Sequence, residues 1–408
     1  KQMQTIEKEI FSNGMPVEAL MEKVGNEISS WILDRQSLIE KGVIVLVGPG
    51  HNGGDGLVVA RELYLSGVDV SIWCPFKIKK DLTLRHLNYA KWIGITNLQH
   101  QPELNPDALW IEALFGLGQT KDISKEIFEL LTAKQKISPN KLISIDVPAG
   151  LCSDSGKAIS KKACKANSTL TIGLYKSGLI QDSALGFVGE LERVDIGIPE
   201  KVLVGLSCNQ PLRISFSDLL TFNWPQPEKN KSKYQRGRVL VIAGSHKYRG
   251  AASLALNGVL ASGVGSINAI LPKIISTGLW GIFPEVVIAG ELTNHSDGSL
   301  DLSNVLEELD LQKFDSILIG PGLGVSEEIN IFGNTLQDFK GLLVLDADGI
   351  NSLSVTTQSW KWLSQRKGPT WITPHIREFE RLFPSVDSSN PLNAAMESAK
   401  ISGASVLL

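Results

Sequence analysis

Asp146 is the residue of this 408-residue chain that its type and position best suit to proton transfer. It stands near the end of the apolar run 142–147 and is followed by Pro148, Ala149 and Gly150. Ligands of open parallel sheets bind beyond the carboxyl ends of the strands, so an aspartate there can give a proton to a bound molecule or take one. The alternative is that Asp146 only forms a cap or turn before the proline.

The nine-residue segment GPGHNGGDG, residues 48–56, could bind a phosphate. Its five glycines allow the backbone to turn tightly and to approach a ligand closely. We expect a helix over residues 57–67 directly after it, and the free N–H groups at the start of that helix would suit a phosphate. The spacing matches neither of the common phosphate-binding glycine patterns, and a tight turn without a ligand is the alternative. A second run that ends in glycines, EALFGLGQ at residues 112–119, indicates little by itself.

Strands and helices must alternate to position these residues, and the sequence predicts this alternation in both halves of the chain. Residues 1–37 have the pattern of two helices. Near-continuous apolar runs separated by helical stretches indicate a parallel sheet that is covered on both faces. The runs of the first half cover residues 43–48, 68–73, 109–115, 142–147, 169–174 and 190–198. Those of the second half cover residues 238–244, 266–272, 316–320, 341–348 and 370–374, with a helix over 251–263. The polar, proline-rich stretch 221–234 lies between the halves, so we expect two three-layer α/β/α domains.

The composition excludes several classes of protein. Forty Lys and Arg residues against 43 Asp and Glu residues give a formal net charge of −3, which argues against a general nucleic-acid binder. No apolar run approaches the length of a membrane-spanning helix, so we expect no membrane partner. The four cysteines form no C-x-x-C pair, which argues against a disulfide framework or a zinc site and indicates a cytoplasmic compartment.

Three motifs of the first half, GPGHNGGDG, EALFGLG and IDVPAG in this order, resemble the N-terminal domain of the NAD(P)H-hydrate repair enzymes. The resemblance extends to MPVEALMEKVG near the start, to KANSTLTIGLYKSGL and to VDIGIP. It implies a Rossmann-like domain over residues 1–215. It also implies an epimerase that interconverts the R and S forms of hydrated NADH or NADPH at C6 of the nicotinamide ring.

The resemblance implies roles for individual residues. Those implied to hold the hydrated dinucleotide are His51, Asn52, Gly53, Gly54, Asp55, Gly116, Leu117, Gly118, Gln119, Thr120, Lys121 and Asp122. Asp146 would contact the reacting ring as its acid/base group. A potassium ion would be bound by Asn52, Glu112 and Ala149. The family usually has Asp in place of Glu112 and Ser in place of Ala149, so we expect a potassium site of weakened affinity.

The second half resembles the ribokinase-like dehydratase domain that often follows the epimerase. The motifs are GRVLVIAGSHKYRGAASLAL, IGPGLG, LDADGIN and ITPHIREFERL. The resemblance implies that residues 216–234 form a linker and that residues 235–408 use ADP with Mg²⁺ to phosphorylate the hydrate, whose phosphate is then eliminated. The residues implied to line this hydrate pocket are Ala251, Gly322, Gly324 and His375. His375 taken alone could equally be a helix cap or a core histidine.

Two expectations concern the chain as a whole. Family dehydratases carry a Gly-Ser/Thr-Gly-Asp motif well beyond the TPH segment, and none follows His375 here. We therefore expect a C-terminally incomplete dehydratase domain that retains epimerase activity and lacks ADP-dependent dehydration. We also expect a homo-oligomer, because the apolar stripe Leu20, Met21, Val24, Ile28, Trp31 and Ile32 could pack against a second copy. A small-molecule kinase with an accessory domain and a non-catalytic dinucleotide-binding scaffold are the alternative functions.

Overall fold

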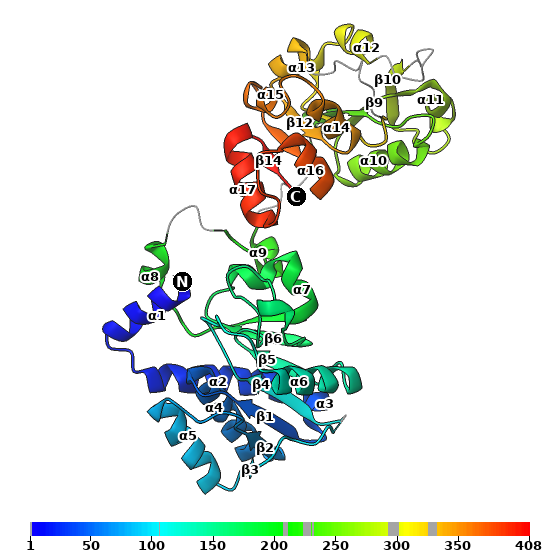
Figure 1. Ribbon diagram of the computed structural model, residues 1–408. Coiled ribbons are helices and arrows are strands. Elements are labelled where there is room, and N and C mark those ends of the chain that lie inside the picture. The colour runs from blue at the N-terminus through cyan, green and yellow to red at the C-terminus, as the bar shows by residue number, and fades with distance from the viewer. Residues whose placement is uncertain are drawn as a thin grey trace. The chain divides into compact units, whose positions relative to one another are not determined.

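The computed structural model describes residues 2–105, 107–206, 211–222, 230, 232–292, 302–324 and 333–408. The chain forms two compact units, Lys1–Arg213 and Ile214–Leu408 (Figure 1). Part of the expected linker, residues 223–229 and 231, lies outside the described residues, as does Cys208.

The first unit is built on a parallel seven-stranded sheet with the order β3-β2-β1-β4-β5-β6-β7. The strands are β1 (Val43–Val47), β2 (Val70–Trp73), β3 (Thr96–Leu98), β4 (Leu109–Ala113), β5 (Leu142–Ile145), β6 (Ser168–Ile172) and β7 (Glu190–Val194). Because β1 pairs with β2 on one side and with β4 on the other, the strand order reverses there. Ligand sites of open α/β sheets occur where the order reverses.

Helices cover both faces of this sheet, as expected. They are α1 (Gln2–Ser12), α2 (Val17–Leu33), α3 (Gln36–Ile39), α4 (His51–Leu65), α5 (Asp81–Trp92), α6 (Lys125–Ile137), α7 (Asp182–Val188) and α8 (Glu200–Val204), with 3₁₀ turns η1 (Ile159–Lys161) and η2 (Ser177–Ile180). The side chains of β1 alternate between two apolar clusters, with Val45 in the cluster below α2 and α4 and Leu46 in the cluster below α6.

Helix α2 packs closely on α4. A Cβ at Gly25 would lie 2.2 Å from Val58 Cγ1, so this helix contact requires a glycine. Most of the apolar stripe of α2 is buried within the unit, including Leu20, Val24 and Ile28. Only Trp31 of the stripe is half-buried rather than buried, so the stripe offers little surface to a second copy. The expected oligomer stays a prediction without this support.

The second unit repeats the architecture, with a parallel sheet of order β10-β9-β8-β11-β12-β13-β14. Its strands are β8 (Arg238–Ile242), β9 (Ser266–Pro272), β10 (Val286–Leu292), β11 (Ser316–Ile319), β12 (Leu342–Leu345), β13 (Thr370–Ile372) and β14 (Ser405–Val406). Its helices are α9 (Phe216–Thr221), α10 (Arg249–Ala261), α11 (Lys273–Leu279), α12 (Ser303–Glu307), α13 (Asn334–Asp338), α14 (Asp348–Ser354), α15 (Lys361–Ser364), α16 (Ile376–Leu382) and α17 (Pro391–Ser402), with 3₁₀ turns η3 (Lys233–Arg236) and η4 (Leu311–Lys313). Two apolar clusters again flank the sheet, one beneath α10 and α11 and one beneath α14 and α16.

The fold class expected from the sequence is confirmed, and the differences are local. Strands β3 and β10 were not expected, because three partly polar residues at a sheet edge give no pattern and β10 is interrupted by an irregularity at Gly290. The first helix after β1 begins at His51 rather than Leu57. Among the described residues, no helix is both long enough and apolar enough to cross a membrane.

Candidate active site

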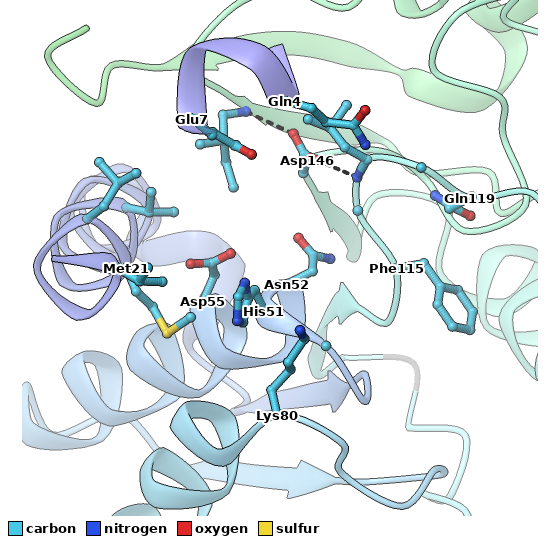
Figure 2. Close-up of a pocket in the computed structure, with 18 of the residues that line it drawn as sticks. Gln4, Glu7, Met21, His51, Asn52, Asp55, Lys80, Phe115, Gln119 and Asp146 are labelled. Atoms are coloured by element: carbon cyan, nitrogen blue, oxygen red, sulfur yellow. Dashed lines mark hydrogen bonds between the residues drawn. The ribbon is translucent and has the colours of Figure 1, made fainter. Parts of the chain in front are cut away.

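A pocket of about 420 Å³ lies in the first unit, at the carboxyl ends of β1 and β4 (Figure 2). Its walls come from α1, α2, the start of α4, the segment after β4 and the residue that follows β5. This is the position at which the strand order reverses, so the sheet topology itself creates the crevice.

The glycine-rich segment forms the start of α4 rather than a loop before it. Gly50 caps the helix, and His51 and Asn52 line the pocket from its first turn. A Cβ at Gly53 would lie 2.1 Å from the carbonyl oxygen of Gly48, and a Cβ at Gly54 would lie 2.6 Å from Met21 Cε. These glycines therefore allow α4 to pack against the chain around it. Neither Gly53 nor Gly54 is a lining residue of the pocket, and their contact with a dinucleotide stays a prediction.

Asp146 is held in a strained and almost fully buried position directly after β5. Its φ is 68°, in the left-handed region that Asp tolerates better than most residues, and it is only 5% exposed. One carboxylate oxygen accepts a hydrogen bond from the Leu117 N–H at 3.0 Å, and the other accepts one from the Ile172 N–H at 3.3 Å. Strain of this kind persists only where the surroundings impose it, and it concentrates at functional sites.

Lys176 completes the surroundings of Asp146, and the sequence reasoning missed its role. Its Nζ lies 2.5 Å from Asp146 Oδ1 and also donates a hydrogen bond to the carbonyl oxygen of Ile172 at 2.6 Å. The lysine lies within the TIGLYKSGL stretch, where its place a few residues after an apolar run was the available signal. The two side chains form a buried ion pair that holds the Asp146 carboxyl group in place.

Two further carboxyl groups face the same space. Figure 2 shows Glu7 from α1 and Asp55 from α4 pointing into the pocket together with Asp146. Burial is the main cause that raises the pKa of Asp55 well above its usual range, and the charges of Asp146 and Glu7 add to it. Burial also raises the pKa of Glu7, with Asp146 adding and Lys176 opposing. Two acidic groups with raised pKa values thus share a pocket with the ion-paired Asp146.

The segment after β4 reaches the pocket with its first residues only. Gly116, Leu117, Gly118 and Gln119 line it. A Cβ at Gly116 would lie 3.1 Å from Asp146 Oδ2, so a glycine keeps the space in front of that carboxylate open. The predicted dinucleotide contacts Thr120, Lys121 and Asp122 are not lining residues of this pocket.

Two of the expected potassium ligands, Glu112 and Ala149, already form hydrogen bonds. Glu112 is fully buried, and its carboxylate accepts hydrogen bonds from the N–H groups of Leu114 and Ala149 and from Ser144 Oγ. The Ala149 carbonyl oxygen accepts a hydrogen bond from the Cys164 N–H at 2.7 Å. The hydrogen atoms of these N–H and O–H donors thus point at the Glu112 and Ala149 oxygens that would coordinate a potassium ion. The third expected ligand, Asn52, lines the pocket and donates its Nδ2–H to the Ile145 carbonyl oxygen. The potassium site stays a prediction, and no step below involves the ion.

The predicted residues of the second unit lie in different settings. Ala251 and Gly322 line a mainly apolar pocket of about 720 Å³, and a Cβ at Gly322 would lie 2.6 Å from Ala251 Cβ. Gly324 donates its N–H to Asp348 Oδ2 at 2.8 Å.

His375 caps α16, as the alternative reading allowed. Its Nδ1 accepts hydrogen bonds from the N–H groups of Arg377 and Glu378, while its own N–H donates to Glu378 Oε2. The side chain is 60% exposed and is not a lining residue of the apolar pocket, so its contact with the hydrate stays a prediction.

The fold and the site define the first unit as a doubly wound α/β domain with a buried carboxyl group in a pocket at the point of strand reversal, followed by a second α/β domain. Residues 17–178 match the family described as YjeF-related protein N-terminus, and residues 239–408 match the family described as NAD(P)H-hydrate dehydratase.

Full-length relatives agree with these matches. The chain is 38% identical over 410 residues to the bifunctional NAD(P)H-hydrate repair enzyme Nnr of Synechocystis sp., with 100% of this chain and 76% of that protein covered. It is 36% identical over 412 residues to the Gloeobacter violaceus protein of the same name, with 100% and 79% covered. The ADP/ATP-dependent NAD(P)H-hydrate dehydratase of Bacillus subtilis, a solved structure, is 24% identical with a TM-score of 0.35, with 45% of this chain and 61% of that chain covered. The chain belongs to the family of bifunctional NAD(P)H-hydrate repair enzymes.

Proposed function

We propose that the first unit epimerises the R and S hydrates of NADH and NADPH at C6 of the nicotinamide ring. The observation that carries the proposal is Asp146, a strained and buried carboxylate that faces a pocket at the point of strand reversal. A non-catalytic scaffold would not need a carboxylate desolvated in this way, because burial of a charge is costly unless a partner compensates it.

The lining residues have separate tasks in this reaction. The free N–H groups at the start of α4, together with His51 and Asn52, bind the dinucleotide, since a helix N-terminus attracts phosphate. Leu117 and Lys176 fix the orientation of the Asp146 carboxylate through hydrogen bonds to its two oxygens. Asp146 then exchanges a proton with the hydroxyl group or water at C6.

The second unit is proposed to be the part of the enzyme that dehydrates the S hydrate at the expense of ADP, with Ala251, Gly322, Gly324 and His375 at the hydrate. We propose that this step also needs the Gly-Ser/Thr-Gly-Asp motif, which does not follow His375 in this sequence. Support comes from the family match over residues 239–408. Mg²⁺ would neutralise charge on the transferred phosphoryl group. Among the residues that the structure describes, no three His, Cys, Asp or Glu side chains gather to hold a metal ion, so no step is assigned to one.

Partners and compartment follow from the same proposal. The partners are small molecules, the hydrate and ADP, and we propose a homo-oligomer in the cytoplasm. Cys74, Cys152 and Cys164 are free thiols in the structure, which fits a reducing compartment.

The experiment is to incubate the protein with a chemically prepared mixture of R and S hydrates and separate them by chromatography. After one epimer has been depleted by a separate S-specific dehydratase, the protein should restore the equilibrium ratio much faster than the uncatalysed reaction. Restoration at the uncatalysed rate would contradict the proposal for the first unit.

A further inference from the structure

Epimerisation at C6 requires chemistry on both faces of the nicotinamide ring. The hydroxyl group leaves from one face and a water molecule adds to the other. One carboxyl group on one side of a bound ring reaches only one of these faces. The question, which rests on the proposed epimerase function, is therefore which second group of the pocket transfers a proton.

Asp55 is a buried carboxyl group that has no partner among the described residues. It is 9% exposed, and the influences on its pKa are burial and the charges of Asp146 and Glu7, with no hydrogen bond among them. Its carboxyl group lines the pocket, so a bound ligand can supply the hydrogen bond that the protein does not. Figure 2 shows the Asp55 carboxyl group directed into the pocket from α4, while Asp146 enters it from the end of β5.

The surroundings of the two aspartates are opposite in charge. Asp146 has a buried ammonium at 2.5 Å and accepts hydrogen bonds from two backbone N–H groups. Asp55 has no such donors, and its neighbours Asp146 and Glu7 are acidic, which favours the neutral acid. Two carboxyl groups in such different surroundings can act as the acid and the base of one reaction.

We propose that Asp55 is the second proton-transfer group of the epimerase and acts on the face of the ring opposite to Asp146. The Asp55 proton passes to the C6 hydroxyl oxygen as the C–O bond breaks, and the lone pair of the ring nitrogen forms a C=N bond. The leaving group departs as water. A second water adds to C6 from the other face, the electron pair of the C=N bond returns to nitrogen, and Asp146 takes the proton of that water. The reverse epimerisation uses the same two groups with their roles exchanged.

Glu7 is the competing candidate and is less well placed. It comes from α1, is only partly buried, and Lys176 opposes the rise of its pKa. Asp55 lies on α4, the helix whose first turn also lines the pocket, so its carboxyl group is fixed relative to the dinucleotide site.

The test compares Asp55→Asn with Glu7→Gln and with Asp69→Asn, a control at an exposed aspartate just before β2. Asp55→Asn should lower the epimerisation rate roughly 10²–10⁴-fold while calorimetry shows hydrate binding of similar affinity. Asp69→Asn should retain the wild-type rate. Because Asp55→Asn removes an unpaired buried carboxyl group, its thermal unfolding midpoint should not fall.

Isotope exchange supplies an independent readout on the wild-type protein. In water labelled with oxygen-18, each inverted hydrate molecule should carry one solvent oxygen at C6 at early times, above the uncatalysed exchange. Inversion without label would overturn the proposed two-face step, as would near-normal turnover of Asp55→Asn or a larger loss in Glu7→Gln than in Asp55→Asn. A wild-type protein that does not epimerise would instead contradict the proposed function itself, so the two failures are distinguishable.

Discussion

Lys176 Nζ lies 2.5 Å from Asp146 Oδ1, and the two side chains are 5% and 7% exposed. A buried ion pair of this kind is sensitive to the loss of one partner, because the remaining charge stays buried and uncompensated. The stability of the first unit therefore depends on both members of the Lys176–Asp146 pair.

Removing the ammonium should destabilise the first unit more than removing both charges. We expect Lys176→Met to lower the free energy of unfolding by about 3–5 kcal/mol, as for other broken buried pairs. The double variant Lys176→Met with Asp146→Asn should recover part of that loss, because no isolated charge remains. Urea unfolding of the single and double variants measures this coupling, and strictly additive losses would argue against a coupled pair.

Asp146→Asn should separate chemistry from binding. The amide keeps the shape of the carboxylate but cannot exchange the proton, so epimerisation should fall roughly 10²–10⁴-fold. Hydrate binding in calorimetry should largely persist, and Asp69→Asn again provides the exposed control. A folded Asp146→Asn protein with near-normal turnover would remove Asp146 from the mechanism.

The packing of the backbone around Gly53 leaves no room for a side chain. A Cβ at Gly53 would meet the Gly48 carbonyl oxygen at 2.1 Å, a backbone atom that cannot move aside cheaply. Gly53→Val should therefore destabilise the first unit by about 1–3 kcal/mol or more and should lose dinucleotide binding together with native structure. Gly186→Val, on α7 with open space around the Cβ position, should leave the unfolding midpoint nearly unchanged. A Gly53→Val protein that has wild-type stability but fails to bind would show instead that Gly53 leaves space for the ligand.

Potassium should not affect the stability of the first unit. The oxygens of Glu112 and the Ala149 carbonyl already accept hydrogen bonds, so exchange of sodium for potassium offers no new contact. Thermal unfolding in NaCl and in KCl at equal ionic strength should give the same midpoint. A midpoint several degrees higher in KCl would show that the expected site forms after all.

The sequence predicted the sheets and the place of Asp146 because both depend on local patterns. Apolar runs mark buried parallel strands, and the IDVPAG motif follows one of them. It did not predict the Lys176 ion pair, because the two residues are 30 positions apart and meet only through pairing of β5 with β6. It also placed the start of α4 too late, because glycines that allow close packing resemble glycines that form a turn.

Glu112 should make the stability of the first unit depend on pH. Burial raises its pKa from 4.5 to about 7, despite hydrogen bonds from the N–H groups of Leu114 and Ala149 and from Ser144 Oγ. The folded-state pKa of Glu112 lies above the unfolded value. The contribution of Glu112 to the free energy of unfolding is therefore fully present below pH 4.5 and declines as the pH rises to about 7. A shift of this size corresponds to a loss of about 3 kcal/mol across that range. Glu112→Gln, which resembles the neutral acid, should flatten this part of the stability profile in urea unfolding between pH 5 and pH 8. A profile of the variant parallel to that of the wild type would assign the pH dependence to other groups.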